Sequence, residues 1–392
     1  MQRFDTIIVG GGIAGLLTAL RLSQSGLRVV VIEKDKLGSG ATLANQGVIH
    51  SGALYVRHHG HIVRQCQEAQ SAFLAFAPAA EISAQKTLLL TPPDTTKEFM
   101  DMLSAHKLNF DTMPINEVQE IETESLQGYS VLSFEERVFS SRQILQENLV
   151  ACLANGVTIL TGTSVDQLIY SEDKVRGVTI GLNQVIESDN VVLAAGLGMA
   201  SILQSFNSHY SQFFTSRLTT MVYLPHASIS RGMVIAAPGK PSIAPARRGA
   251  LAALFGDMQP PIQDDRKFSV KFSKSQELIS GVNEYFDHKS LDTRDAIFYT
   301  CGKTDYAGNV TAAKGRNGRP LDPGFQVIDH ATQDKISGLY SVLPGKMTLA
   351  FHASKVVTEH ILKEDVDLII TQTNHGDAVL DNRLAVEPWA SL

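Results

Sequence analysis

A single histidine, His50, stands among small and apolar residues in the stretch TLANQGVIHSGALY, residues 42–55. A neutral imidazole has an unperturbed pKa of about 6.5, so it can take up a proton at physiological pH. The glycines on either side, Gly47 and Gly52, let the backbone approach a flat ligand closely. The pattern is typical of a ligand-facing segment with a general base. The alternative is a packed histidine bonded to a backbone carbonyl, and what precedes His50 decides between them.

The residues before His50 have the order of a dinucleotide-binding unit. Thr6–Val9 and Arg28–Ile32 are predicted to be buried parallel strands, and leucines at helical spacing lie between them. Glu33 ends the second strand, where its carboxylate can accept hydrogen bonds from ribose hydroxyls. In the turn G-x-G-x-x-G, glycines allow a tight bend, the approach of a pyrophosphate and close packing of the helix on the strand. These glycines are Gly10, Gly12 and Gly15.

The segment that follows Glu33 favours FAD over NAD. It resembles the second phosphate loop of the FAD-dependent D-amino-acid oxidase superfamily, which reads E-x(6)-G-A-S/T-x(2)-N-x-G. The matching residues are Glu33, Gly40, Ala41, Thr42, Asn45 and Gly47. The resemblance implies that Thr42 reaches the pyrophosphate and that the backbone from Asn45 to Val48 runs beside the flavin ring.

Two later segments extend this resemblance. A predicted strand ends in Ala195-Gly196, as in the strand that closes the nucleotide domain of these families, and Val165 would hold the adenine. Near the end, the turn PGKMT is similar to the G-G-K-x-T of FAD-dependent glycerol-3-phosphate dehydrogenases, with Pro344 in place of the first glycine. Lys346 in this turn would face the flavin edge where negative charge collects on reduction. A solvated loop lysine is the alternative.

Together these motifs predict one non-covalently bound FAD. The residues assigned to it are Gly10, Gly12, Ile13, Ala14, Gly15, Glu33, Lys34, Ala41, Thr42, Asn45, Gln46, Gly47, Val165, Ala195, Gly196, Gly345, Lys346, Met347 and Thr348. Cys301 lies roughly where the related sarcosine oxidases carry a flavin-linked cysteine, but the surrounding residues match poorly, so covalent attachment is not expected.

The run GVIHSGALY is similar to G-V-I-H-A-G-I-Y-Y of the L-2-hydroxyglutarate oxidases. The resemblance implies oxidation of a small anion, a 2-hydroxy acid, by hydride transfer to flavin N5, with His50 and Lys346 as the catalytic pair. Oxidation of a C–N bond in an amino acid or amine is the alternative, and a flavin-binding protein without catalysis is a third possibility. The residues expected to bind substrate are Tyr55, Arg57, Arg247 and Lys303, with Arg248 as a further anion clamp.

The expected fold is α/β, a Rossmann-like FAD-binding domain with an inserted substrate domain built on a mainly antiparallel sheet. Residues 1–80, 146–204 and 306–365 are assigned to the FAD-binding domain. The substrate domain takes 81–145 and 205–305, and 366–392 form a C-terminal tail. Strands are expected in KTLLLTPP, LTTMVYLP, RGMVIAAP and KFSVKF, and a helix in TKEFMDMLSAHKL.

Bulk properties exclude several other classes. The net charge of −6 over 392 residues has no basic stripe, so nucleic acid is not expected as a partner. Three scattered cysteines form neither a disulfide framework nor a zinc site and fit a reducing cytoplasm, and His58, His59 and His61 are assigned to a solvated turn rather than a metal. No export signal and no apolar run long enough to span a membrane are visible. The electron acceptor stays open among oxygen, a quinone and a protein.

Overall fold

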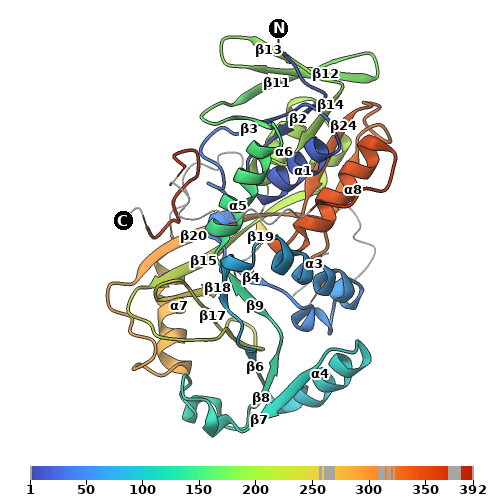
Figure 1. The fold of residues 1–392 in the computed structure, drawn as a ribbon. Coiled ribbons are helices and arrows are strands. Elements are labelled where there is room, and N and C mark those ends of the chain that lie inside the picture. The colour runs from blue at the N-terminus through green and yellow to red at the C-terminus, as the bar shows by residue number, and fades with distance from the viewer. Residues whose placement is uncertain are drawn as a thin grey trace.

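The structure is a computed structural model. It describes residues 2–255, 258–259, 270–307, 314–315, 319–320, 323–369 and 381–390. The expected α/β class is confirmed, because helices pack on a parallel sheet and a second, larger sheet lies beyond it, in the lower half of the view (Figure 1).

A six-stranded sheet forms the first half of the molecule. Five of its strands are parallel, and the last, β23, is antiparallel. In spatial order they are β10 (Thr158–Leu160), β3 (Val29–Ile32), β2 (Thr6–Val9), β14 (Asn190–Leu193), β24 (Leu339–Leu343) and β23 (Gln326–Asp329). The central strands β3, β2 and β24 are buried along their whole length, and β14 is buried except at Asn190, as their largely apolar sequences predict.

Helices cover one face of this sheet and a smaller sheet covers the other. The helices are α1 (Ile13–Gln24), α5 (Ser141–Ala154) and α8 (Ala350–Leu362), whose apolar residues share one core with β3 and β24. On the opposite face lie α6 (Met199–Ser205) and a four-stranded sheet of β1 (Gln2–Arg3), β13 (Gln184–Glu187), β12 (Lys174–Ile180) and β11 (Val165–Ser171). Both faces of the six-stranded sheet are thus covered, so a ligand site on this sheet can form at the ends of its strands.

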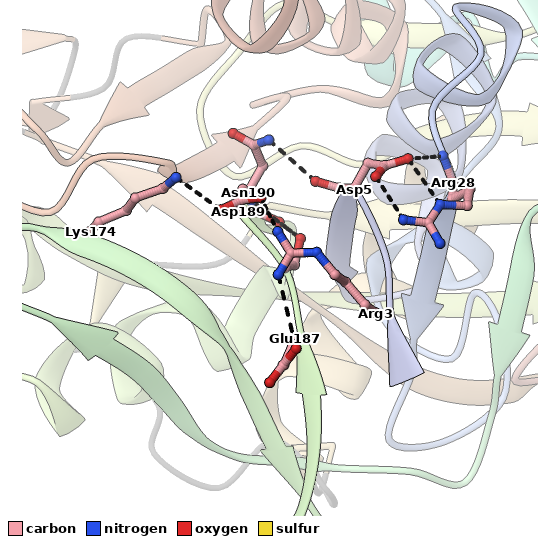
Figure 2. A network of polar contacts seen from close by, with 8 residues as sticks. Arg3, Asp5, Arg28, Lys174, Glu187, Asp189 and Asn190 are labelled. Carbon is pink, nitrogen blue, oxygen red and sulfur yellow. Dashed lines mark hydrogen bonds and ion pairs between the residues drawn. The ribbon is translucent and has the colours of Figure 1, made fainter. Parts of the chain in front are cut away.

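Ion pairs attach the N-terminal strand to this small sheet (Figure 2). Arg3 contacts Asp189 and lies 3.9 Å from Glu187, while Lys174 Nζ is 2.8 Å from the other oxygen of Asp189. Asp5 pairs with Arg28 at 3.1 Å, and the Arg28 guanidinium holds the pKa of the Asp5 carboxyl below its usual value. All these groups are substantially exposed, so each pair contributes little to stability.

A nine-stranded, mostly antiparallel sheet forms the second half. Along its path run β19 (Met258–Gln259), β15 (Phe214–Leu224), β18 (Ala250–Leu254), β17 (Ser242–Pro245), β16 (Met233–Ile235), β6 (Thr87–Thr91), β8 (Ser130–Phe134) and β7 (Phe110–Met113), while β20 (Ile297–Tyr306) pairs with β15. Only β16 and β6 pair in parallel among these strands of the described chain. Helices α7 (Phe272–Tyr285) and α4 (Pro93–Ala105) pack on it, and α4 confirms the predicted helix.

The remaining elements lie outside the two large sheets. They are α2 (Ala41–Ala44), α3 (Val63–Phe76), an antiparallel pair of β21 (Lys314–Gly315) and β22 (Arg319–Pro320), and a three-stranded sheet of β4 (Val48–Ile49), β9 (Arg137–Phe139) and β5 (Glu81–Ser83). Short 3-10 turns cover Ala53–Tyr55 and Met347–Leu349. No helix in the described part of the chain is long and apolar enough to cross a membrane.

One predicted strand is wrong. KFSVKF, residues 267–272, lies partly outside the described residues, and its last residue, Phe272, begins α7. The six-residue window resembles a strand, but the downstream residues Ser275, Leu278, Val282 and Tyr285 recur at helical spacing and are buried. Packing of that longer apolar face outweighs the local β propensity.

The C-terminal segment 381–390, within the expected tail, packs against both halves. Leu384 is 3% exposed and forms a bridge with Leu37 in the core of the six-stranded sheet. Trp389 stacks on Tyr223 of β15 with ring centroids 5.5 Å apart, and contacts Tyr299 of β20 at 5.4 Å. This segment therefore connects the halves through side-chain packing.

We expect Leu384→Ala to lower the free energy of unfolding by about 2–5 kcal/mol, because it leaves a cavity in a closed core. Val386→Ala is the matched control, since Val386 is 49% exposed and its truncation should cost less than about 0.5 kcal/mol. Urea unfolding of both variants beside the parent measures the difference. Equal midpoints for the two variants would show that the segment does not contribute to the core.

Candidate active site

A cavity of about 720 Å³ lies between the two large sheets. Its first wall consists of the turns that follow β2, β3, β14 and β24, so it is built on the carboxyl ends of four parallel strands. Its second wall consists of residues on β6, β16, β17 and β20. The volume and position are those of a ligand site in an open α/β sheet.

The N-terminus of α1 forms an anion-binding end of this cavity. Gly12, Ile13 and Ala14 line it, and the helix begins at Ile13 with Gly12 as its N-cap, no side-chain cap and no acidic residue in its first turn. Thr42 Oγ1 accepts a hydrogen bond from Ile13 N at 3.1 Å, which brings the two phosphate motifs together. Free amides and the helix dipole at this point favour phosphate oxygens.

Gly15 and Glu33 fix the backbone at the end of the cavity where α1 begins. A Cβ on Gly15 would lie 2.0 Å from the carbonyl oxygen of Gly10, so only glycine lets α1 approach the end of β2 this closely. The Glu33 carboxylate accepts hydrogen bonds from Gly11 N at 2.7 Å and Asp35 N at 2.9 Å. Burial raises the pKa of Glu33 although these two amides oppose the shift. Glu33 and Lys34 both line the cavity.

Asn45 and Gly47 shape the loop that leads to His50. The Asn45 side chain donates to Thr42 O at 2.6 Å and accepts from Gly47 N at 2.6 Å. Gly47 has φ of 74°, and a Cβ there would lie 2.1 Å from Phe139 O. Gln46 then bonds to Ser242 O and Leu251 O of the nine-stranded sheet at 3.2 and 3.0 Å. These contacts turn the loop so that it forms one side of the cavity.

His50 lies in the cavity wall next to a buried carboxylate. Its Nδ1 is 3.0 Å from Glu136 Oε2, and its backbone N–H donates to Thr348 Oγ1 at 3.0 Å. The imidazole side chain is 17% exposed, whereas that of Glu136 is 0% exposed. Ser51 Oγ donates to the other Glu136 oxygen at 3.1 Å. Within the described part of the chain, His50 Nε2 has no hydrogen-bond partner.

Cationic side chains gather on the same wall. Lys346 Nζ lies 5.1 Å from the ring centroid of Tyr55, whose edge faces His50. Burial lowers the pKa of Lys346 well below its ordinary value, and the charges of Lys303 and Arg217 lower it further. The pKa of Lys303 is lowered by burial and by Arg217. Asp305 offsets part of the charge of Arg217 through a 2.9 Å ion pair.

Most of the predicted site residues line this one cavity. They are Gly10, Gly12, Ile13, Ala14, Glu33, Lys34, Ala41, Thr42, Asn45, Gln46, His50, Tyr55, Arg57, Ala195, Gly196, Lys303, Gly345, Lys346 and Met347. Gly15, Gly47 and Thr348 lie behind its wall and act through the contacts given above. Arg57 is partly neutralised, because its guanidinium pairs with Glu98 and lies over the Phe99 ring.

Three predicted residues are not among those that line the cavity: Val165, which begins β11, and the neighbours Arg247 and Arg248. Arg247 donates to Ala79 O at 3.2 Å and Gln143 Oε1 at 3.3 Å. Cys301 is buried in an apolar cluster, and burial raises its thiol pKa, which disfavours the reactive thiolate. His58 lines the cavity, and the described residues contain no cluster suited to a metal ion.

Glu136 and Arg217 were missed by sequence reasoning. Glu136 lies 86 positions from His50 in FEERVF, a segment without a motif. Arg217 stands in the middle of the apolar strand β15, where its charge is the one available signal. Long-range pairing of strands, which a single sequence does not specify, brings both to the site.

Comparison with known sequences points to one family. The sequence model of the DAO family, described as FAD dependent oxidoreductase, matches residues 5–357. One component of the anaerobic glycerol-3-phosphate dehydrogenase of Escherichia coli K12 is 23% identical over 376 residues, which cover 88% of this chain and 64% of that protein. The chain therefore spans less than two thirds of that relative. A probable FAD-dependent oxidoreductase of Pseudomonas aeruginosa is 48% identical over 54 residues, 14% of each chain.

Solved structures share the fold. NikD, described as an unusual amino acid oxidase, superposes with a TM-score of 0.73 at 15% identity, covering 95% of this chain and all of that one. Glycine oxidase from Geobacillus kaustophilus gives 0.70 at 16% identity, with 96% and 100% coverage. L-proline dehydrogenase from P. horikoshii gives 0.71 at 15%, with 94% and 96% coverage. Identities this low show the fold alone.

The cavity fits FAD. A helix N-terminus without a capping side chain on Gly12 lies at one end, Glu33 stands beside it, and Ala44, Asn45, Gln46 and Val48 of the following loop line the cavity. Gly10, Gly12 and Gly345 line it without side chains that would fill it. The chain binds FAD as the DAO-family members do, and these are the residues that would hold it.

We expect the purified protein to be yellow and to release intact FAD on acid precipitation. Gly15→Ala should abolish FAD binding, because the new Cβ would meet the Gly10 carbonyl and push α1 off β2. Gly181→Ala, which meets no atom within 4 Å, is the control and should keep its flavin. Flavin absorbance per mole of folded protein measures both. A fully loaded Gly15→Ala variant would contradict this account of the turn.

Lys346 should make anion binding sensitive to alkaline pH. A lysine binds a carboxylate in its protonated form, and its lowered pKa means that this form disappears at a lower pH than for an exposed lysine. The affinity of the holoenzyme for a small carboxylate such as oxalate should thus fall as pH rises through the lowered pKa. Lys346→Met should weaken binding about 10- to 100-fold and remove that pH dependence.

Titration of the flavin absorbance spectrum with oxalate at several pH values makes this measurement. Lys335→Met serves as the control, because Lys335 is exposed and bonds to Thr332 O. An unchanged dissociation constant in Lys346→Met would assign this lysine to packing instead.

Proposed function

Because the chain belongs to the DAO family of FAD-dependent oxidoreductases, we propose that it oxidises a small anionic substrate, a 2-hydroxy acid. The observation that carries the proposal is one cavity wall that holds an imidazole, His50, together with two lysines, Lys303 and Lys346. Alcohol oxidation requires a group that accepts the hydroxyl proton, and an anionic substrate requires fixed positive charge. FAD, when bound, supplies the acceptor for the hydride that leaves the carbinol carbon.

His50 takes the hydroxyl proton in this proposal. Its ring is partly exposed to the cavity, and Nδ1 is occupied by Glu136, so Nε2 is the nitrogen available to substrate. The backbone bond from His50 N to Thr348 Oγ1 fixes the residue against the turn that carries Lys346. Proton acceptor and cation thus come from two loops that are bonded to each other.

Lys346 and Lys303 bind the substrate carboxylate. Burial lowers the pKa of both; the charge of Arg217 lowers both further, and that of Lys303 also lowers the pKa of Lys346, so a bound anion relieves an unfavourable charge interaction. Arg57 is a weaker candidate for a second anionic group, because Glu98 already pairs with it. The charge of this wall supports an anionic substrate without specifying its length.

Oxidation of a C–N bond is the competing proposal. The solved structures with the same fold include amino acid oxidases, but at these identities they carry no information on substrate. A neutral amine reacts without a protein base, so a cavity-facing imidazole favours the alcohol. The Escherichia coli relative is named for oxidation of an alcohol, glycerol 3-phosphate, and it shares only 23% of aligned residues.

A panel of substrates separates these proposals. Small 2-hydroxy acids, glycerol 3-phosphate and amino acids are mixed anaerobically with the holoenzyme, and bleaching of the flavin absorbance is followed. We expect bleaching by a hydroxy acid. Bleaching by amino acids alone would replace the proposal with amine oxidation, and no bleaching by any member would favour a flavin-binding protein without catalysis.

We expect His50→Ala to retain FAD and to slow anaerobic flavin reduction about 10²–10⁴-fold, the usual contribution of a general base. FAD should stay bound because the imidazole makes no contact with the phosphate loops. His61→Ala is the control, since His61 is exposed on the neighbouring loop. Stopped-flow absorbance gives the rates. Reduction of His50→Ala at the parent rate would assign His50 a packing role.

A further inference from the structure

We propose that Glu136 is a positioning residue that holds His50 in the tautomer with the proton on Nδ1, which leaves Nε2 free to accept the substrate proton. The inference rests on the proposed role of His50 in hydroxy acid oxidation, but its physical content, a carboxylate that fixes a tautomer, can be measured separately. Glu136 lines the cavity beside His50, and its side-chain hydrogen bonds run to His50 and Ser51 rather than to either phosphate loop.

Strand register brings the two residues together. β4 and β9 pair antiparallel with Val48 opposite Val138 and Ile49 opposite Arg137. One step further along the same register, His50 falls opposite Glu136. Directly opposed residues of an antiparallel pair have neighbouring side chains. The 3.0 Å contact between Nδ1 and Oε2 is therefore a consequence of backbone pairing.

The surrounding bonds fix the carboxylate. Glu136 N donates to Phe134 O at 2.8 Å, which bends the chain between β8 and β9. Gln70 on α3 donates to Ile49 O at 3.1 Å and to Glu135 O at 2.8 Å, so it ties the residue before His50 to the residue before Glu136. Ser51 Oγ occupies the second carboxylate oxygen. Both partners therefore have little freedom to move apart.

The Glu136 carboxylate determines which tautomer His50 adopts. A carboxylate accepts hydrogen bonds, so a neutral imidazole beside it donates from Nδ1 and leaves Nε2 unprotonated. The buried carboxylate also stabilises the imidazolium that forms when Nε2 takes a proton. Tyr55 contacts the His50 ring, and the charge of Glu136 acts on both Tyr55 and Cys66, while Arg217 acts on Tyr55 and Lys346 on Cys66. Burial raises the pKa of Tyr55 and Cys66, which keeps both neutral, so Glu136 is the anion that His50 contacts.

The first measurement is spectroscopic and needs no turnover. In holoenzyme labelled with ¹⁵N-histidine, His50 should show a protonated Nδ1, a deshielded proton on it and an unprotonated Nε2, assigned by loss of these signals in His50→Gln. Glu136→Gln should abolish this pattern, because an amide can also donate to Nδ1 and no longer imposes one tautomer. Glu135→Gln is the matched control: it is the neighbouring, half-exposed glutamate, 3.5 Å from Arg137, and should leave the signals unchanged.

The second measurement is kinetic. Glu136→Gln should slow flavin reduction at saturating substrate by a large part of the about 10²–10⁴ attributed to the base, with little change in substrate affinity. Glu136→Asp, which keeps the carboxylate, should recover part of the rate. In a His50→Ala background, Glu136→Gln should have no further effect, because a residue that acts through the imidazole has nothing left to position.

The two measurements separate the possible failures. Parent-like histidine signals in Glu136→Gln would overturn the positioning role, whatever His50 does in catalysis. A further loss of rate when Glu136→Gln is added to His50→Ala would overturn it too, since Glu136 would then act by another route. A clear Nδ1–H signature together with parent-rate reduction by His50→Ala would instead refute the proposed function and leave the tautomer assignment intact.

Discussion

The site depends on a short antiparallel ladder between β4 and β9. Gly47 accepts a bond from Phe139 N at 2.8 Å, and its missing side chain lets Phe139 O approach where a Cβ would be 2.1 Å away. The pairs Val48–Val138 and Ile49–Arg137 follow. β4 continues the second phosphate loop, and β9 continues β8 of the nine-stranded sheet. This ladder therefore sets the distance between the loop that is expected to lie beside the flavin and the sheet that forms the opposite wall of the cavity.

Asn45 and Gly47 of the second phosphate loop therefore have two roles, one toward the cofactor and one in strand pairing. Asn45 and Gly47 are expected from the resemblance to lie beside the flavin, and here their hydrogen bonds also set the register of β4. Because side chains alternate along a strand, a slip of one residue would turn His50 away from the cavity. The geometry of the proton acceptor is thus determined by a motif that is usually read as a cofactor signature.

Local order was predictable and long-range pairing was not. The glycine turn, Glu33, the strand before Ala195 and the turn at Lys346 were identified because each is a contiguous pattern with a physical requirement of its own. Glu136, Arg217 and the packed segment around Leu384 and Trp389 lie far in sequence from what they contact. Arg247 was placed by analogy of position in a segment with no tight motif, and it bonds outside the cavity.

The fold does not determine the substrate, because the residues expected to bind FAD and the cationic side chains of the cavity come from different parts of the structure. The four strand ends and the two phosphate loops come from the six-stranded sheet, and any enzyme that binds FAD in this way needs them. The cations come from both halves: Lys346 from the turn after β24, and Lys303 and Arg217 from adjacent strands β20 and β15, which pair Arg217 with Lys303 directly. Two cations at opposed positions repel each other, and Asp305 on the same strand compensates only one of them. That arrangement costs stability, and the anionic substrate of the proposed function would offset the cost. The fold does not require these cationic side chains. They are therefore the residues in which the substrate preference of this chain should be looked for.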